Sequence, residues 1–225
     1  VQQTVEDALE KLHKRKISLQ GSGRTDSGVH AFAQAANFYS PVDSIPVEKY
    51  PVALNCFLPD DVRIMDASVV DEDFSARRNA TSRVYRYFIN TGKPFASQMR
   101  YVWPIYYRPD IEKLNKMAEC LHGEIDCSTF AAAGDQSVSM FRYIDDAHFF
   151  YEGENLVFQI EANAFLWKMV RSITGSLIYF ERMGKDAEFF KEVLESKERK
   201  NAGPTAPAKG LFLHEIKFDG IRRHI

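Results

Sequence analysis

RYIDDAHFFYEGENLVFQIEA, residues 142–162, contains two runs of alternating apolar side chains on either side of a short polar stretch. Alternation with a period of two is typical of β-strands, and a short glycine-containing connection between two such runs is typical of a hairpin. The stretch therefore predicts two antiparallel strands that turn between Glu152 and Asn155.

Helices flank this hairpin in the second half of the sequence. Before it, Asp110 is expected to cap a helix, and residues 99–107 form a strand candidate. After it, the apolar spacing predicts a long helix over about residues 164–182, a second helix from Asp186, and a final strand over residues 211–218.

The first half also mixes helices with strands. Thr4 is a suitable N-cap for an opening helix, and SIPVEKYPVALNCFLP, residues 44–59, predicts a short one. Residues 29–39, 62–70 and 83–90 have the composition and alternation of strands.

Because both halves combine helices with hairpin-paired strands, the sequence predicts the α+β class. The turn residues TGKP, at positions 91–94, indicate a boundary between residues 1–93 and residues 94–225. We expect two similar α/β sub-domains that share a mostly antiparallel sheet.

The composition is that of a folded globular protein. The chain has 225 residues, and 45% of them are hydrophobic, which is enough for a sizeable core. No apolar run reaches the roughly 18 residues that span a bilayer, and the first residues lack the pattern of a signal peptide. Three cysteines without CxxC spacing support neither a disulfide framework nor a zinc site. We therefore expect a cytoplasmic protein with buried, reduced thiols and no membrane association.

The overall charge does not indicate nucleic-acid binding, because the net charge is −2 and the pI is near 6.3. Basic side chains nevertheless gather in two places. Such clusters are compatible with one basic face, although charge runs are more often solvated surface. The clusters consist of Arg77, Arg78, Arg83 and Arg86, and of Lys168, Arg171, Arg182 and Lys185.

A glycine-rich stretch, GSGRTDSGVHA at residues 21–31, holds a single carboxylate, Asp26. It lacks the lysine of a P-loop, and Asp26 stands where a dinucleotide-binding fingerprint needs glycine. One carboxylate is too few for a calcium loop. Three glycines imply unusual backbone angles or a close approach, so a structural turn and a functional loop both stay open. Asp26 itself either caps its own loop or, beside Arg24, serves as an ionised nucleophile or base.

Two further segments carry polar side chains at notable positions. Tyr85 and Tyr87 share one face of a predicted strand, where tyrosines are usually core but can also stack on a base. In the helix predicted after the hairpin, Arg171 lies opposite the apolar stripe. Gly175, one turn later, indicates that another segment packs tightly there. Arg171 is therefore either a solvated residue or a partner for a carboxylate on a neighbouring loop.

At this point six segments of the chain resemble those of a known family. GSGRTDSGVHA resembles the hallmark loop of the TruA-type tRNA pseudouridine synthases, which typically reads GAGRTDAGVHA. Five further segments resemble family motifs in the same order, over residues 21–218 in all. They are LNCFLPDDVRI, FSARRNATSRVYRY, GEIDCSTF, NAFLWKMVRSITG and APAKGLFLHEIKF.

The resemblance implies a pseudouridine-synthase fold with the active-site cleft between two sub-domains. It places the family's catalytic aspartate on Asp26, its active-site tyrosine on Tyr85, and the arginine that pairs with the aspartate on Arg171. Neither a metal nor an organic cofactor is implied.

The resemblance also implies a tRNA substrate, with uridines 38–40 of the anticodon stem-loop as targets, and a homodimer. Arg24 matches the loop arginine that the family uses to hold the target base out of the stack. From the basic clusters, Arg77, Arg83 and Lys168 are expected to contact the RNA.

Two departures from the family pattern matter. The family normally has a strand and a Y-D-G-x-x-F-x-G-W-Q type stretch before its first helix, whereas this sequence starts at VQQTVEDAL. We therefore expect either that about 30 residues precede this sequence or that the gene product is truncated, which would expose a sheet edge. The loop GDQSVSM, residues 134–140, is poorer in basic residues than its counterparts, which puts one patch of RNA contacts in doubt.

Two alternatives stay open at this point. The chain could be a relative that modifies other tRNA positions or other RNAs, or it could be an RNA-binding module that kept the fold and lost turnover. An assay of pseudouridine formation with an Asp26→Asn variant separates them.

Overall fold

The computed structural model describes residues 1–223 and divides into two compact units. Unit 1 comprises Val1–Arg24 and Gln34–Ala80, and unit 2 comprises Thr25–Ala33 and the chain from Thr81 onward. The division therefore differs from the boundary expected between residues 93 and 94. Its physical reason is that the strand before that boundary is hydrogen-bonded along its length to two strands from the end of the chain.

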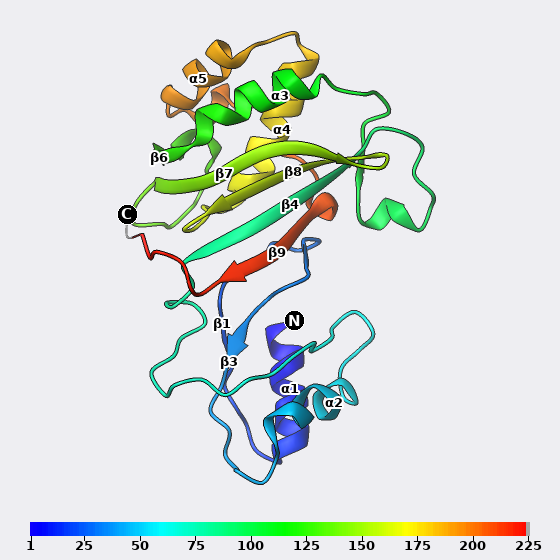
Figure 1. Ribbon diagram of the computed structural model, residues 1–225, viewed down its shortest axis with the longest axis vertical. Coiled ribbons are helices and arrows are strands. Elements are labelled where there is room, and N and C mark those ends of the chain that lie inside the picture. The colour runs from blue at the N-terminus through cyan, green and yellow to red at the C-terminus, as the bar shows by residue number, and fades with distance from the viewer. Residues whose placement is uncertain (224–225) are drawn as a thin grey trace. The chain divides into compact units, whose positions relative to one another are not determined.

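Unit 2 is built on a mostly antiparallel sheet, which confirms the α+β class (Figure 1). In the described part of the chain this sheet has seven strands in the order β2-β9-β4-β8-β7-β6, with β5 also paired to β4. Only the β2–β9 and β4–β5 pairs are parallel. The bounds are β2 His30–Ala31, β4 Ser82–Asn90, β5 Trp103–Pro104, β6 Gly123–Asp126, β7 Phe141–Glu152, β8 Asn155–Ala162 and β9 Leu211–Lys217.

The hairpin predicted over residues 142–162 is confirmed. Strands β7 and β8 pair in antiparallel register, and Glu152 faces Asn155 across the turn. Because β4 pairs with the other edge of β8, the hairpin lies within the sheet rather than at its edge.

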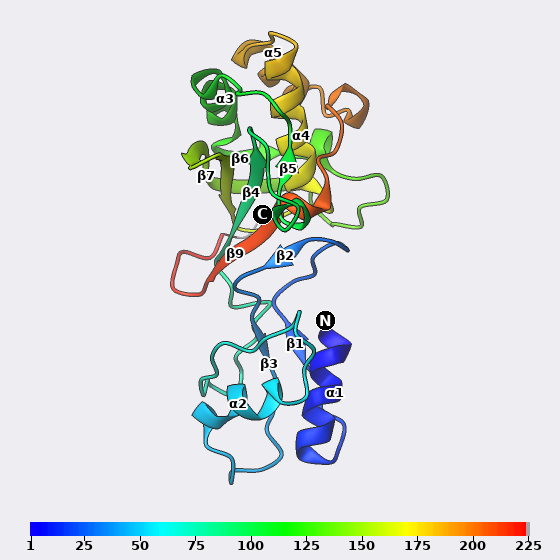
Figure 2. The same cartoon turned by 90° about the vertical axis from the view of Figure 1, so that its right-hand side faces the viewer.

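Three helices cover one face of this sheet (Figures 1 and 2). They are α3 (Ile111–Ala118), α4 (Met169–Arg182) and α5 (Ala187–Glu195). The Asp110 side chain caps α3 by accepting backbone N–H bonds, as the sequence predicted, and the Asp186 side chain caps α5 in the same way. The fully buried core between helices and sheet includes Met117, Leu121, Phe130, Phe158, Ile160, Ile173 and Leu177.

Helix α4 begins five residues later than the expected start near residue 164. Lys168 has a φ of 59°, in the left-handed region, so the α-helix cannot extend back through it. The apolar stripe is confirmed, because Met169 and Val170 are buried together with Ile173 and Leu177.

Unit 1 contains two helices, α1 (Gln2–His13) and α2 (Tyr50–Asn55), and a small antiparallel sheet of its own. This sheet pairs β1 (Gln20–Gly21) with β3 (Ala36–Asn37), so the long sheet is not shared between the units described here. The buried core of unit 1 is formed by Val5, Ala8, Leu9, Ile17, Tyr50 and Leu54.

The strand predicted over residues 62–70 is absent from the structure in the described residues, and a side chain explains why. Asn55 donates to the Ile64 carbonyl and accepts from the Ile64 N–H, both at 2.8 Å. This amide thereby occupies both backbone groups of Ile64, so a β-ladder on that side cannot run through this residue. The strands expected over residues 29–39 and 99–107 are likewise only two-residue ladders.

The thiols are not all buried. Cys56 is exposed, contrary to expectation, while Cys127 is buried. Among residues 1–223 no helix is long and apolar enough to cross a membrane, and no cluster of three potential metal ligands occurs.

Short 3₁₀ turns connect the helices and strands. They are Val47–Lys49, Gln98–Arg100, Glu119–Leu121, Ser128–Phe130, Arg199–Asn201 and Ala208–Gly210.

Candidate active site

The two oxygens of the Asp26 carboxylate are bound by two different side chains of unit 2. Arg171 Nη1 donates to Oδ2 at 2.7 Å, and Trp167 Nε1 donates to Oδ1 at 2.9 Å. The side chains of Asp26 and Arg171 are 21% and 15% exposed, so the ion pair is largely shielded but still partly accessible to solvent. The structure thus brings together two predicted residues that lie 145 positions apart.

A tight turn follows Asp26 and explains one glycine of the loop. The Val29 N–H donates to the Asp26 carbonyl at 3.1 Å, which closes a four-residue turn. Gly28 has a φ of 81°, the value that the third residue of a type II turn requires. The Asp26 side chain itself binds Arg171 and Trp167 from a distant part of the chain.

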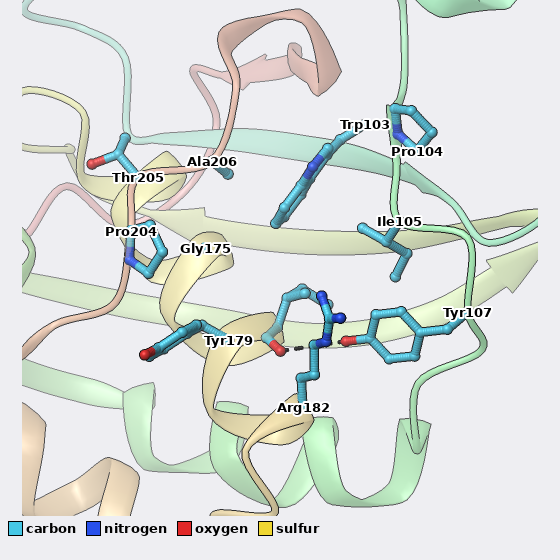
Figure 3. Close-up of a pocket in the computed structure, with 11 residues that line it drawn as sticks. Trp103, Pro104, Ile105, Tyr107, Gly175, Tyr179, Arg182, Pro204, Thr205 and Ala206 are labelled. Carbon is cyan, nitrogen blue, oxygen red and sulfur yellow. Dashed lines mark hydrogen bonds between the residues drawn. The ribbon is translucent and has the colours of Figure 1, made fainter.

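Arg171 is held in place by the segment that runs past its helix, residues 203–207. Arg171 Nε donates to the Ala206 carbonyl at 2.9 Å, and the Ala206 N–H donates to the Arg171 carbonyl at 3.0 Å. One turn along α4, a Cβ on Gly175 would lie 1.9 Å from the Pro204 carbonyl oxygen (Figure 3). The close packing predicted from this glycine is therefore confirmed, and its purpose is to let residues 203–207 reach the helix.

Residues 203–207 are fixed at both ends by further hydrogen bonds. Near the start, Arg199 donates to the Gly203 carbonyl at 3.2 Å and to Thr205 Oγ1 at 2.9 Å. At the other end, Tyr87 Oη donates to the Pro207 carbonyl at 2.6 Å. The direction of the Arg171 guanidinium is consequently set by a rigid neighbour rather than by its own helix alone.

The two tyrosines of β4 have different environments. Tyr87 is fully buried, and burial raises the pKa of its hydroxyl, so it is a core residue. Tyr85 is half-buried and packs edge-on against Phe165, with ring centroids 5.1 Å apart. Burial raises the pKa of Tyr85 to about 12; the Arg83 charge opposes this shift and the Asp26 carboxylate adds to it. The Tyr85 phenol is thus protonated at neutral pH.

The predicted RNA-contacting residues fall into two groups. In unit 2, Arg83 is half-buried and donates to the Asn163 carbonyl at 2.7 Å, and the Lys168 ammonium lies 4.5 Å from the Trp167 ring centroid. Arg24 and Arg77 are exposed residues of unit 1, so they are not part of the site described in unit 2.

Sequence reasoning missed Trp167, which binds the same carboxylate as Arg171. The apolar spacing predicts one helix over residues 164–182, in which Trp167 is an ordinary exposed residue. The signal that could have found it is a tryptophan one helical turn before a candidate site arginine.

A second feature of unit 2 is a cavity of about 310 Å³ beside α4 (Figure 3). Trp103, Tyr107 and Arg182 line it together with Gly175 and Pro204–Ala206, and Tyr107 Oη donates to Glu181 at 3.1 Å. The described residues that line this cavity do not include Asp26 or Tyr85.

The fold and the site together define an α+β protein with a shielded carboxylate held by a guanidinium. A family model described as tRNA pseudouridine synthase matches residues 1–77 and 117–219. Several curated proteins named tRNA pseudouridine synthase A are similar to the chain.

That of Treponema denticola is 53% identical over 97% of this chain and 82% of its own length. That of Treponema pallidum strain Nichols is 45% identical over 91% and 73%, and that of Brachyspira hyodysenteriae is 38% identical over 97% and 88%. The chain belongs to the tRNA pseudouridine synthase family.

Proposed function

We propose that this chain isomerises uridine to pseudouridine in tRNA, with Asp26 as the nucleophile. The observation that carries the proposal is the shielded Asp26 carboxylate, which Arg171 binds at 2.7 Å and which stays partly exposed. The names of the family's members, which specify tRNA pseudouridine synthesis, support the reaction and the substrate.

The reaction needs only a few chemical groups. The glycosidic C–N bond breaks, the uracil rotates, and a C–C bond forms at C5, so the product is an isomer and no redox partner takes part. Asp26 adds either to C1′ of the sugar or to C6 of the base, and the C–O bond so formed later breaks to regenerate the carboxylate. A base must also take the C5 proton, and the site must retain the detached ring.

Arg171 serves this chemistry by position and charge. Its guanidinium is itself fixed by the two backbone hydrogen bonds to Ala206, so it holds the Asp26 carboxylate in one orientation. It also balances the negative charge when the C–O bond breaks and the electron pair returns to Asp26.

Tyr85 is the proposed partner for the C5 proton. Because burial raises its pKa to about 12, Tyr85 enters the reaction as a phenol rather than as a phenolate. Tyr85 therefore accepts the C5 proton only while it gives its own phenol proton to another acceptor. The negative charge of Asp26 contributes to the raised pKa of this phenol. The ring also supplies a flat surface for the uracil.

We further propose that the target uridines lie at positions 38–40 of the anticodon stem-loop. A base inside a stem is out of reach of a side chain, so the nucleotide must be flipped out. Arg24 is the proposed residue that holds it out, and Arg77, Arg83 and Lys168 are proposed to bind the RNA backbone. A homodimer acting in the cytoplasm completes the proposal.

The decisive experiment measures tritium release from tRNA transcripts labelled at uridine C5. We expect turnover by the unmodified protein, none by Asp26→Asn, and similar tRNA affinity for both in a filter-binding assay. Turnover by the variant at the normal rate would refute the assignment of Asp26.

Mapping of the modified positions tests the anticodon stem-loop. Pseudouridine elsewhere in the RNA would favour a relative with another target, and tRNA binding without turnover would favour a binding module. Light scattering measures the oligomeric state, and a monomer would contradict the homodimer.

A further inference from the structure

We propose that Trp167 is a positioning residue for Asp26, acting through its indole N–H; this inference rests on the proposed function of Asp26. Arg171 binds only one oxygen of the carboxylate, and Trp167 binds the other at 2.9 Å. A carboxylate bound at one oxygen can still turn about its Cβ–Cγ bond. Two donors, one for each oxygen, hold it in a single rotational position.

The backbone of Trp167 is anchored independently of this contact. Its N–H donates to the Asp135 carboxylate, and its carbonyl accepts from the Ala132 N–H at 3.0 Å. Burial opposes ionisation of Asp135, but hydrogen bonds from Ser137 and from the Trp167 N–H outweigh it and lower the pKa of Asp135. The anchor therefore stays charged at neutral pH and holds the tryptophan backbone in place.

Burial does not account for the position of the Trp167 ring. The residue is 47% exposed, and the Lys168 ammonium lies 4.5 Å from its ring centroid. Trp103, by contrast, packs against the core and edge-on to Tyr87. Packing alone does not fix the orientation of a half-exposed indole, whereas the hydrogen bond to Asp26 does.

The hydrogen bond has a specific use in the reaction. When the bond between Asp26 and the nucleoside breaks, the electron pair returns to a carboxylate oxygen. The Trp167 N–H is already in place to donate to that carboxylate, and it keeps its own proton throughout. It therefore stabilises the departing carboxylate without taking part in proton transfer.

The half-exposed ring suggests a competing role, in which it stacks on a base of the RNA. The substitution Trp167→Phe separates the two roles, because phenylalanine keeps an aromatic surface and loses the N–H. Trp103→Phe is the matched control, since it makes the same truncation at a residue that does not contact Asp26.

We expect Trp167→Phe to lower kcat about 10- to 100-fold, the usual effect of removing a hydrogen bond to a charged group. The KM for tRNA and the melting temperature should stay close to those of the unmodified protein, and Trp103→Phe should leave kcat within about threefold. An unchanged kcat, with or without a higher KM, would overturn the proposal in favour of stacking. Loss of activity through unfolding would overturn it in favour of a structural role.

A second measurement does not depend on catalysis. Unfolding free energies of Trp167→Phe, Asp26→Ala and the double variant form a mutant cycle that isolates the contact between the two side chains. Non-additive effects would support the contact, and additive effects would overturn it. If the unmodified protein made no pseudouridine, the proposed function would fail while the cycle still reported on Trp167.

Discussion

The substitution Gly175→Ala tests whether residues 203–207 position Arg171. The added Cβ would lie 1.9 Å from the Pro204 carbonyl oxygen and 2.8 Å from the Ala206 nitrogen, whereas ordinary contact begins at 3.4 Å. Both atoms belong to the backbone, which cannot rotate away as a side chain can. Residues 203–207 or the helix must therefore shift by about 1.5 Å at Pro204.

The expected effects on stability and activity differ in size. Alanine in place of glycine favours a helix by about 1 kcal/mol, and overpacking costs about 1–3 kcal/mol, so the net loss of stability is at most about 2 kcal/mol. Activity should fall further, because Ala206 binds Arg171 through two hydrogen bonds. A misplacement of about 1 Å at a catalytic group can lower the rate about 100-fold.

Tritium release and a urea unfolding curve on the same preparation measure both quantities. The matched control is Ser172→Ala in the same helix, where the hydroxyl is buried and has no hydrogen-bond partner among the described residues. We expect this control to keep its activity and its stability. If Gly175→Ala were as active as the control, the argument that residues 203–207 aim Arg171 would be refuted.

Three further predictions concern single side chains. Tyr85→Phe should fold normally and lose about 100- to 10,000-fold in kcat, as measured by tritium release; retention of full activity would remove Tyr85 from the mechanism. Burial, together with the Arg15 charge, lowers the pKa of His13 below its usual 6.5, so the unfolded chain binds more protons just below that pH and stability falls on acidification. In urea unfolding at pH 5.5 and 7.5, His13→Phe should show a smaller loss than the unmodified protein, and an equal loss would contradict this cause. Asp110→Ala should cost about 1 kcal/mol by urea unfolding, because α3 loses two N-cap bonds, whereas an unchanged midpoint would show that the cap contributes nothing.

The features that the sequence predicted correctly depend on local interactions. The β7–β8 hairpin depends on alternation and a polar turn, and the starts of α3 and α5 depend on Asp110 and Asp186 accepting N–H bonds nearby. Each of these is determined by residues that are near one another in the chain, which a single sequence displays directly.

The features that were predicted wrongly depend on distant partners. Residues 62–70 have strand composition, but the Asn55 side chain, rather than a neighbouring strand, binds the backbone N–H and carbonyl of Ile64. The boundary of the compact units lies before β4 because β8 and β9, from the end of the chain, are its partners. Neither partner can be recognised from local composition.

The candidate site shows both cases at once. Asp26 could be recognised because it lies in a glycine-rich stretch, and Arg171 because it lies opposite the apolar stripe of its helix. The two residues are nevertheless 145 positions apart in the chain. Trp167 could not be recognised, because its role depends on where α4 begins. Lys168 has a φ of 59°, so α4 begins only at Met169, and Trp167 lies before the helix with its backbone N–H bound by Asp135. Its indole binds one carboxylate oxygen while Arg171, from within the helix, binds the other.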